Sequence, residues 1–247
     1  MRKPRRESPV PGMKSRLAAG VAVAGACALL AACSSVQLGA AAIVGNQRIT
    51  QSSLDNEVSN LQQNVTRYGL TSQVKAADMP KDVLTWLVRF RVTDRAARDA
   101  GITVSQEEIQ RTLNAFDAQE QQAIRSQGAA YPGLTQLLVL NGLPPDQETT
   151  FGRWLAEENA LVKNANGGKL PTTQAEATTT TQHLNLASCK AAKALNIRVN
   201  PQYGQLSYQV DPNSGQGIYA VMAQADGLSR PSGQASSAPP TSASQPC

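Results

Sequence analysis

The chain has 247 residues, with 23 Lys and Arg, 18 Asp and Glu, and a formal net charge of +5. Six of these cations and one of these acids precede residue 33, which leaves 17 of each in residues 33–247. If the first segment is removed, the remaining chain is neutral, and its charge gives no reason to expect a nucleic acid or an anionic membrane surface as a partner.

The first 32 residues have the composition of an export signal. Cations are followed by an apolar run over residues 17–32, which is shorter than the roughly 20 residues of a membrane span. The run ends in Leu30-Ala31-Ala32-Cys33, which resembles the lipobox of bacterial lipoproteins. The resemblance implies that Cys33 is acylated and becomes the first residue of the mature protein. An uncleaved anchor is the alternative.

These features predict a location at the cell membrane, with the protein lipid-anchored on the extracytoplasmic face. We expect residues 1–32 to be the signal peptide and residues 33–40 a linker to the anchor. Outside the cytoplasm, Cys189 and Cys247 could form a disulfide, although two unpaired cysteines are equally compatible with the sequence.

The next segment predicts a small hairpin and three capped helices. Residues 40–50 contain two extended stretches around Gly45-Asn46, a dipeptide suited to a tight turn. Thr50 is placed to cap a helix that reaches about residue 68. Pro80 opens a helix that ends at Gly101, and Ser105 opens a third, which ends near Gly128.

The second half of the chain predicts further helices and two strands. An apolar segment over residues 134–140 precedes a helix from about residue 145 to 162, and residues 170–181 are either a linker or the frayed start of a helix to residue 195. Extended stretches follow at residues 197–199 and 205–210. From about residue 229 the chain has few large apolar side chains, which predicts a disordered tail within a C-terminal extension over residues 211–247.

Together these elements predict a mainly α fold, with a helical domain over residues 41–210 closed by a few short β-strands from the two ends of the chain. The stretch near Ile43 could pair with the one near Val199 and bring the two ends together around the helices.

The order of these motifs resembles the N-terminal chaperone domain of SurA/PrsA-type foldases. The resemblance rests on residues 42–50, the capped helix after them, and the segments at residues 80–88 and 101–109. Residues 194–204 are similar to the returning strand of an actinobacterial lipoprotein branch. The resemblance implies binding of non-native polypeptides. Many of these foldases also carry a parvulin domain with paired histidines, whereas this chain has one histidine, His183.

The sequence offers no strong catalytic or metal-binding pattern, and we expect no enzyme activity, metal or other cofactor. His183 and Cys189 are six positions apart, too far for adjacent turns of one helix. Glu107-Glu108 and Glu157-Glu158 are interpreted as a helix start and a solvated helix face. The four arginines between residues 89 and 98 alternate with Asp94 and Asp99, which favours a charged helix face over an anion site.

We therefore expect a membrane-anchored, chaperone-like lipoprotein that binds unfolded or exported polypeptides without prolyl isomerase activity. Two alternatives stay open: a scaffold or assembly lipoprotein with one dedicated cell-envelope partner, and a peptidyl-prolyl isomerase. Several large apolar side chains could contact a bound peptide where they are not part of the core: Trp86, Leu134, Leu137, Leu138 and Trp154.

Overall fold

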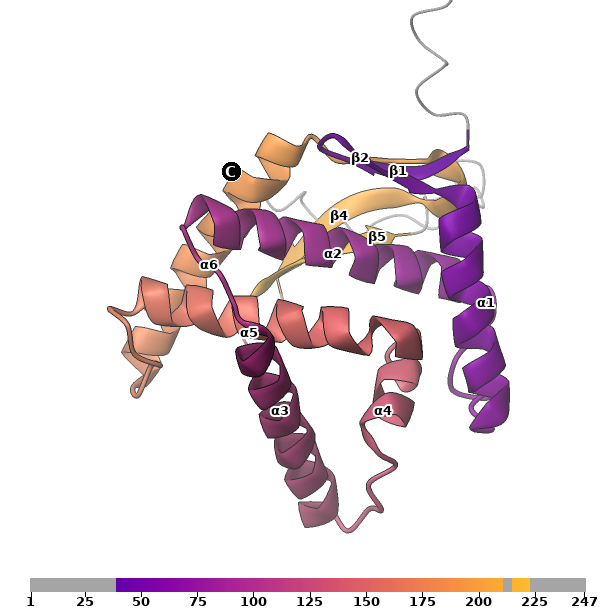
Figure 1. Ribbon diagram of the computed structural model, residues 1–247, viewed down its shortest axis with the longest axis horizontal. Coiled ribbons are helices and arrows are strands. Elements are labelled where there is room, and N and C mark those ends of the chain that lie inside the picture. The colour runs from indigo at the N-terminus through magenta and orange to yellow at the C-terminus, as the bar shows by residue number, and fades with distance from the viewer. Residues whose placement is uncertain (1–38, 211–214, 223–247) are drawn as a thin grey trace, which may run out of the picture. The chain divides into compact units, whose positions relative to one another are not determined.

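The computed structural model describes residues 39–210 and 215–222 (Figure 1). The predicted signal peptide, Cys33, most of the linker and the predicted tail lie outside these ranges. The described part is mainly helical with short antiparallel strands, as expected. Its elements in chain order are β1 Ala40–Val44, β2 Gln47–Thr50, α1 Gln51–Arg67, α2 Met79–Asp99, α3 Gln106–Ser126, α4 Leu134–Leu140, α5 Glu148–Ala165, α6 Gln174–Leu195, β3 Arg198–Val199, β4 Gln205–Val210 and β5 Gly217–Met222.

Helices α1, α3 and α6 each begin at a residue whose side chain caps the first turn. The Thr50 hydroxyl accepts from the Ser53 amide at 3.0 Å, and the Ser105 hydroxyl accepts from the Glu108 amide at 3.1 Å. Thr173 and Glu176 form a complete capping box at the start of α6. Because this box fixes the first turn, the polar segment after residue 173 is helical rather than a linker.

A three-stranded antiparallel sheet closes the helical domain in the order β2-β1-β3. Ala42 pairs with Val199 and Ile43 with Arg198, which confirms the predicted pairing of the first and last extended stretches. The amide of Asn200 donates to the Ala41 carbonyl at 2.9 Å and extends this pairing by one bond. Segments about 155 residues apart in the sequence therefore lie side by side.

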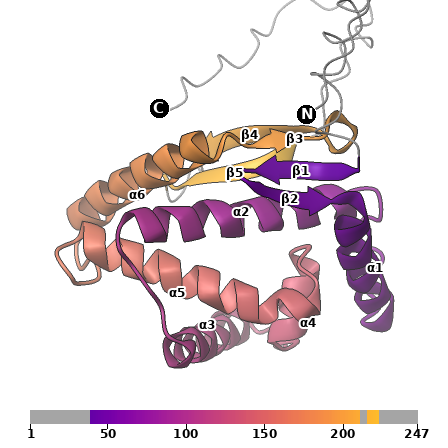
Figure 2. The same cartoon turned by 45° about the horizontal axis from the view of Figure 1, so that its top comes forward.

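Helix α2 lies at the centre of the fold and is covered on several sides (Figure 2). Buried residues of α2 join α1, β1, α6 and β5 in the main apolar core, which includes Val83, Leu84 and Val88. A second, aromatic cluster forms where α2 meets α3, α4 and α5, with Phe90 and Phe151 at its centre. Helix α2 thus contributes to both cores, because its apolar side chains cover more than one stripe.

A second, two-stranded sheet extends the domain beyond the expected boundary at residue 210. Strand β5 pairs with β4 along its whole length, from Val210↔Gly217 to Gln205↔Met222. Val221 is 2% exposed and belongs to the main core. The expected boundary is therefore wrong, and the domain continues to Met222. The ring of Tyr208 lies over Gly217, where any Cβ would collide with it.

We predict that a chain truncated after Leu195 loses its cooperative thermal unfolding transition. The truncation removes the partner of β1 and uncovers the part of the main core that β4 and β5 cover. Circular dichroism during heating, with reductant present so that no disulfide contributes, compares this chain with the full chain. An unchanged thermal midpoint in the truncated chain would show that the strand pairing is not required.

Candidate functional site

A cavity of about 360 Å³ opens between α2 and α5, beside the start of α1 and strand β2. We call it the α2–α5 pocket. The apolar part of its wall is formed by Leu87, Phe90 and Trp154. The remaining wall is polar or charged and is formed by Gln47, Ser53, Glu57, Arg91, Asp94, Gln147, Thr150, Arg153 and Glu157.

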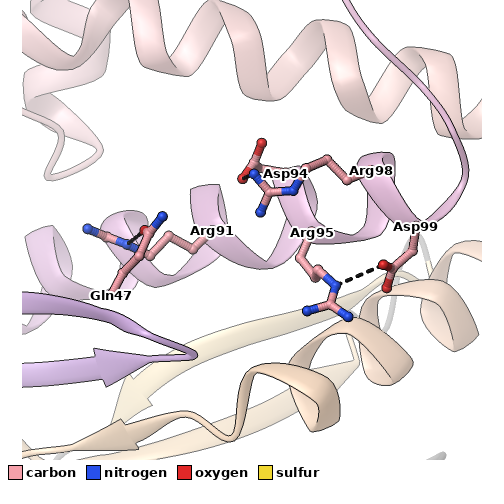
Figure 3. A network of polar contacts seen from close by, with 6 residues as sticks. All are labelled: Gln47, Arg91, Asp94, Arg95, Arg98 and Asp99. Carbon is pink, nitrogen blue, oxygen red and sulfur yellow. Dashed lines mark hydrogen bonds and ion pairs between the residues drawn. The ribbon is translucent and has the colours of Figure 1, made fainter.

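A second hollow, of about 330 Å³, lies further along α2, between the β1–β2 turn and the end of α6. It shares Gln47, Arg91 and Asp94 with the α2–α5 pocket, so the two cavities adjoin at these three side chains. Arg91 is fixed there, since its Nε donates to Gln47 Oε1 at 3.0 Å and its Nη1 donates to the Leu87 carbonyl at 3.0 Å (Figure 3). Burial lowers the pKa of the Arg91 guanidinium, and Asp94 partly opposes that shift.

The other charges on this part of α2 are matched by ion pairs one turn apart. Arg98 Nη1 lies 2.7 Å from Asp94 Oδ2, and Arg95 Nε lies 2.8 Å from Asp99 Oδ1. Figure 3 shows the two pairs on opposite sides of the helix, with Asp94 and Arg98 toward α5. The expected charge balance is therefore present for these four residues, but on two sides of α2 rather than on one face.

Arg89 differs from this expectation because it turns into the protein. Its Nε donates to the Tyr219 carbonyl at 2.8 Å, and its guanidinium lies 5.1 Å from the ring centroid of Trp86. Burial lowers the pKa of Arg89, an effect that the charge of Glu158 opposes. Arg89 thus attaches β5 to α2 rather than facing solvent.

Two carboxyl groups in the α2–α5 pocket are held in surroundings that disfavour their charge. Glu157 is only 5% exposed and Glu158 is half-buried, so the interpretation of Glu157-Glu158 as a solvated face is wrong. Burial and the nearby charge of Asp94 raise the pKa of Glu157 to about 7, against the opposing effects of Arg153 and Arg98.

The second carboxyl group, Glu57, lies on α1. Its Oε1 accepts from Gln147 Nε2 at 2.8 Å, whereas its buried Oε2 has no hydrogen-bond partner among the described residues. Burial and the proximity of Asp146 raise the pKa of Glu57. The pocket can therefore offer apolar contact, hydrogen-bond donors and acceptors, and carboxyl groups that take up protons above the usual range of glutamate.

Of the five apolar residues proposed for peptide contact, only Trp154 lines the α2–α5 pocket. Its Nε1 donates to the Thr93 hydroxyl at 3.1 Å, and its ring packs on Phe151 with centroids 5.5 Å apart. Trp86 is half-buried in the same aromatic cluster, where its Nε1 donates to the Asn141 carbonyl at 2.9 Å. These bonds fix both indoles.

The three leucines on α4 are distributed differently. Leu134 and Leu137 are half-buried, whereas Leu138 is 3% exposed and belongs to the aromatic cluster. The proposal of Leu138 as a peptide-contacting residue is therefore corrected, because the short helix turns this side chain toward Phe90 and Phe151 rather than to solvent.

One protein family matches a part of the chain that contributes residues to this pocket. Residues 16–132 match the family model of the SurA-like N-terminal domain, a span of slightly less than half of the chain. Residues 16–132 are thus similar to the SurA-like N-terminal domain, the domain type that the sequence motifs resemble. Comparisons with curated proteins and with solved structures gave no match.

The matched span contains only one wall of the pocket. The pocket residues of β2, α1 and α2 lie within the SurA-like match, whereas those from Gln147 to Glu157 follow it. Sequence reasoning did not single out Gln47, Glu57 or Arg153. These polar residues lie on separate elements, and no local spacing signals that the fold brings them together.

The other predicted site residues lie away from the α2–α5 pocket or outside the described ranges. Glu107 and Glu108 lie in the first turn of α3, as expected. Cys189 is buried and disulfide-bonded, but Cys247 and Cys33 lie outside the described residues, so the pairing with Cys247 and the lipidation of Cys33 stay predictions. Within the described ranges, no cluster of three His, Cys, Asp or Glu could hold a metal ion, and no helix is long and apolar enough to cross a membrane.

We predict that Glu157→Gln stabilises the folded protein at pH 8 by roughly 1 to 3 kcal/mol and has little effect near pH 4.5. A raised carboxyl pKa means that the folded state binds more protons than the unfolded state between about pH 4.5 and 7. Stability therefore falls as the pH rises through this window, and Gln removes the charge that causes the fall. Urea unfolding at both pH values measures the effect.

The control for this experiment is Glu107→Gln, which removes a carboxylate whose side chain is 88% exposed. It should leave the difference between the two pH values unchanged. Equal destabilisation by Glu157→Gln at pH 4.5 and pH 8 would contradict the electrostatic explanation and indicate a packing effect.

Proposed function

We propose that this protein is a chaperone-like lipoprotein that binds segments of unfolded or exported polypeptides in the α2–α5 pocket. The observation that carries the proposal is the SurA-like N-terminal domain, which connects the chain to a chaperone-like foldase family. The pocket adds physical support, because one wall is apolar and the rest carries donors, acceptors and both signs of charge. Such a lining accommodates many side chains rather than one.

The proposal does not include prolyl isomerase activity. The chain has one histidine, His183 on α6, whereas the parvulin domains of related foldases carry paired histidines. We propose that binding alone is the activity of this chain, with no cofactor and no catalytic centre of its own. A dedicated scaffold role would require the same pocket to accept one partner only.

We predict that the full chain at stoichiometric concentration reduces the aggregation of several unrelated unfolded proteins, and that Ser53→Trp weakens this effect at least about fivefold. Ser53 is exposed at the wall of the pocket, so a large side chain there fills space without removing a buried group. Light scattering after dilution of the unfolded clients from denaturant measures the effect.

The matched control is Ser52→Trp, because Ser52 is also exposed on the first turn of α1 but does not line the pocket. A proline-limited refolding reaction with the same clients tests for catalysis, since uncatalysed isomerisation takes tens to hundreds of seconds. Acceleration far below one equivalent of protein would refute the binding-only proposal. Suppression for no client but one would favour the dedicated scaffold.

We also propose that lipidated Cys33 anchors the protein at the extracytoplasmic face of the membrane, on the basis of the Leu30-Ala31-Ala32-Cys33 sequence. We predict that Cys33→Ala moves the protein from the membrane fraction to the soluble fraction or leaves it unprocessed. The control is Cys27→Ala, which should leave the fractionation unchanged. Mass spectrometry that finds an unmodified Cys33 within an uncleaved chain would contradict the proposal.

A further inference from the structure

The two edges of the β4–β5 sheet differ in how their backbone groups are satisfied. Along the outer edge of β5, three groups bond to helix side chains: the Gly217 amide to Asn185 Oδ1 at 2.7 Å, the Tyr219 carbonyl to Arg89 Nε at 2.8 Å, and the Val221 amide to Thr85 Oγ1 at 2.9 Å. Helices α2 and α6 therefore bond one outward backbone group of each of these three residues and cover this edge.

The same bonds define the orientation of β4. Opposite residues in an antiparallel pair alternate between pairs that exchange hydrogen bonds and pairs whose backbone groups point away from each other. The backbone groups of Gly217, Tyr219 and Val221 point away from β4. The backbone groups of the residues opposite them, Val210, Tyr208 and Leu206, therefore point away from β5. No backbone or side-chain group of the described residues bonds to these outward groups of β4.

The open edge of β4 also lacks the features that usually protect an edge strand. Exposed edges are commonly protected by charged side chains, prolines or bulges. Strands β4 and β5 contain no charged residue and no proline, and their pairing is continuous. Val210 is 51% exposed and Met222 is 39% exposed, and they are among the few large apolar residues that are exposed in the described part of the chain.

We propose that the open edge of β4 binds an extended, uncharged segment of a non-native polypeptide, which adds to the β4–β5 sheet as a third strand. The inference rests on the proposed function and adds a second contact to it, because backbone groups of the client pair with Leu206, Tyr208 and Val210. The sheet has no charge over its 12 strand residues, so an uncharged segment matches it and a charged one would lose hydration without gaining an ion pair.

The probe is an uncharged eight-residue peptide of alternating threonine and valine, blocked at both ends, which is long enough to span six residues of β4. A second version is methylated on every alternate amide nitrogen, which removes the donors of one edge and keeps the side chains. Fluorescence anisotropy with the full chain measures both affinities. We expect methylation to weaken binding by roughly tenfold to a hundredfold, corresponding to two or three lost hydrogen bonds.

Residue-resolved amide hydrogen exchange locates the peptide. We expect exchange at Leu206, Tyr208 and Val210 to slow at least about tenfold with bound peptide, while the amides of Ser207 and Gln209, already paired with β5, change little. The edge variant Gln205→Lys should weaken binding. Its control is Met222→Lys, which places the same charge directly opposite, on β5, the strand whose outer edge bonds to α2 and α6.

The remaining outcomes test the strand-addition proposal separately from the proposed α2–α5 pocket. Binding of the peptide or of unfolded clients without protection on β4 would overturn the strand-addition proposal and leave the α2–α5 pocket as the binding site. Slow amide exchange on β4 without peptide would also overturn the strand-addition proposal. Protection that depends on protein concentration would show that a second copy occupies the edge. Protection that does not depend on concentration would show that another part of this chain occupies it. Failure of both peptide and clients to bind would overturn both proposals.

Discussion

The pairing of β1 with β3 is the constraint on which the rest of the structure depends. The turn amide of Gly45 donates to the Leu195 carbonyl at 2.6 Å, and the Asn200 side chain donates to the Ala40 carbonyl at 3.0 Å, so the end of α6 and the chain after β3 are both tied to the first strand. This closure holds α6 and the β4–β5 sheet against α2. Contacts so distant in sequence cost loop entropy, which burial of the shared core must offset.

Helix α2 contributes residues to both apolar clusters, to the wall of the pocket and to the bonds that hold the second sheet. Its apolar residues fill two clusters, while its polar residues reach outward to different partners: Thr85 and Arg89 to β5, Arg91 to Gln47 on β2, and Thr93 to Trp154 on α5. The bonds of Thr85, Arg89 and Thr93 satisfy groups that are buried or partly buried, whereas the bond between Arg91 and Gln47 is exposed. The polar side chains of α2 therefore fix the strands and α5 at defined positions, and the α2–α5 pocket is the space that remains between them.

Features with a local signal could be predicted from the sequence, and features that depend on distant contacts could not. The caps at Thr50 and Ser105 could be predicted because each hydroxyl bonds to an amide only three residues further along the chain. The β1–β3 closure could be predicted from two extended stretches at the two ends of a helical chain. Strand β5 was missed although residues 211–215 before it have the composition of a turn. Its own six residues give a weak strand signal, and its position depends on distant contacts with Thr85, Arg89 and Asn185. The sequence predicts a solvated Glu157, because it cannot show that α2 covers this residue.

The α2–α5 pocket and the open edge of β4 would recognise different properties of a bound chain. The pocket would contact side chains, whereas the edge would pair with backbone amides and carbonyls. In a folded protein nearly all buried backbone groups are already paired, and large apolar side chains are mostly in the core. Only a non-native segment offers both together in an extended conformation. A protein that uses both contacts can thus distinguish unfolded from folded chains without reading a particular sequence, since the property it detects is the absence of intramolecular pairing.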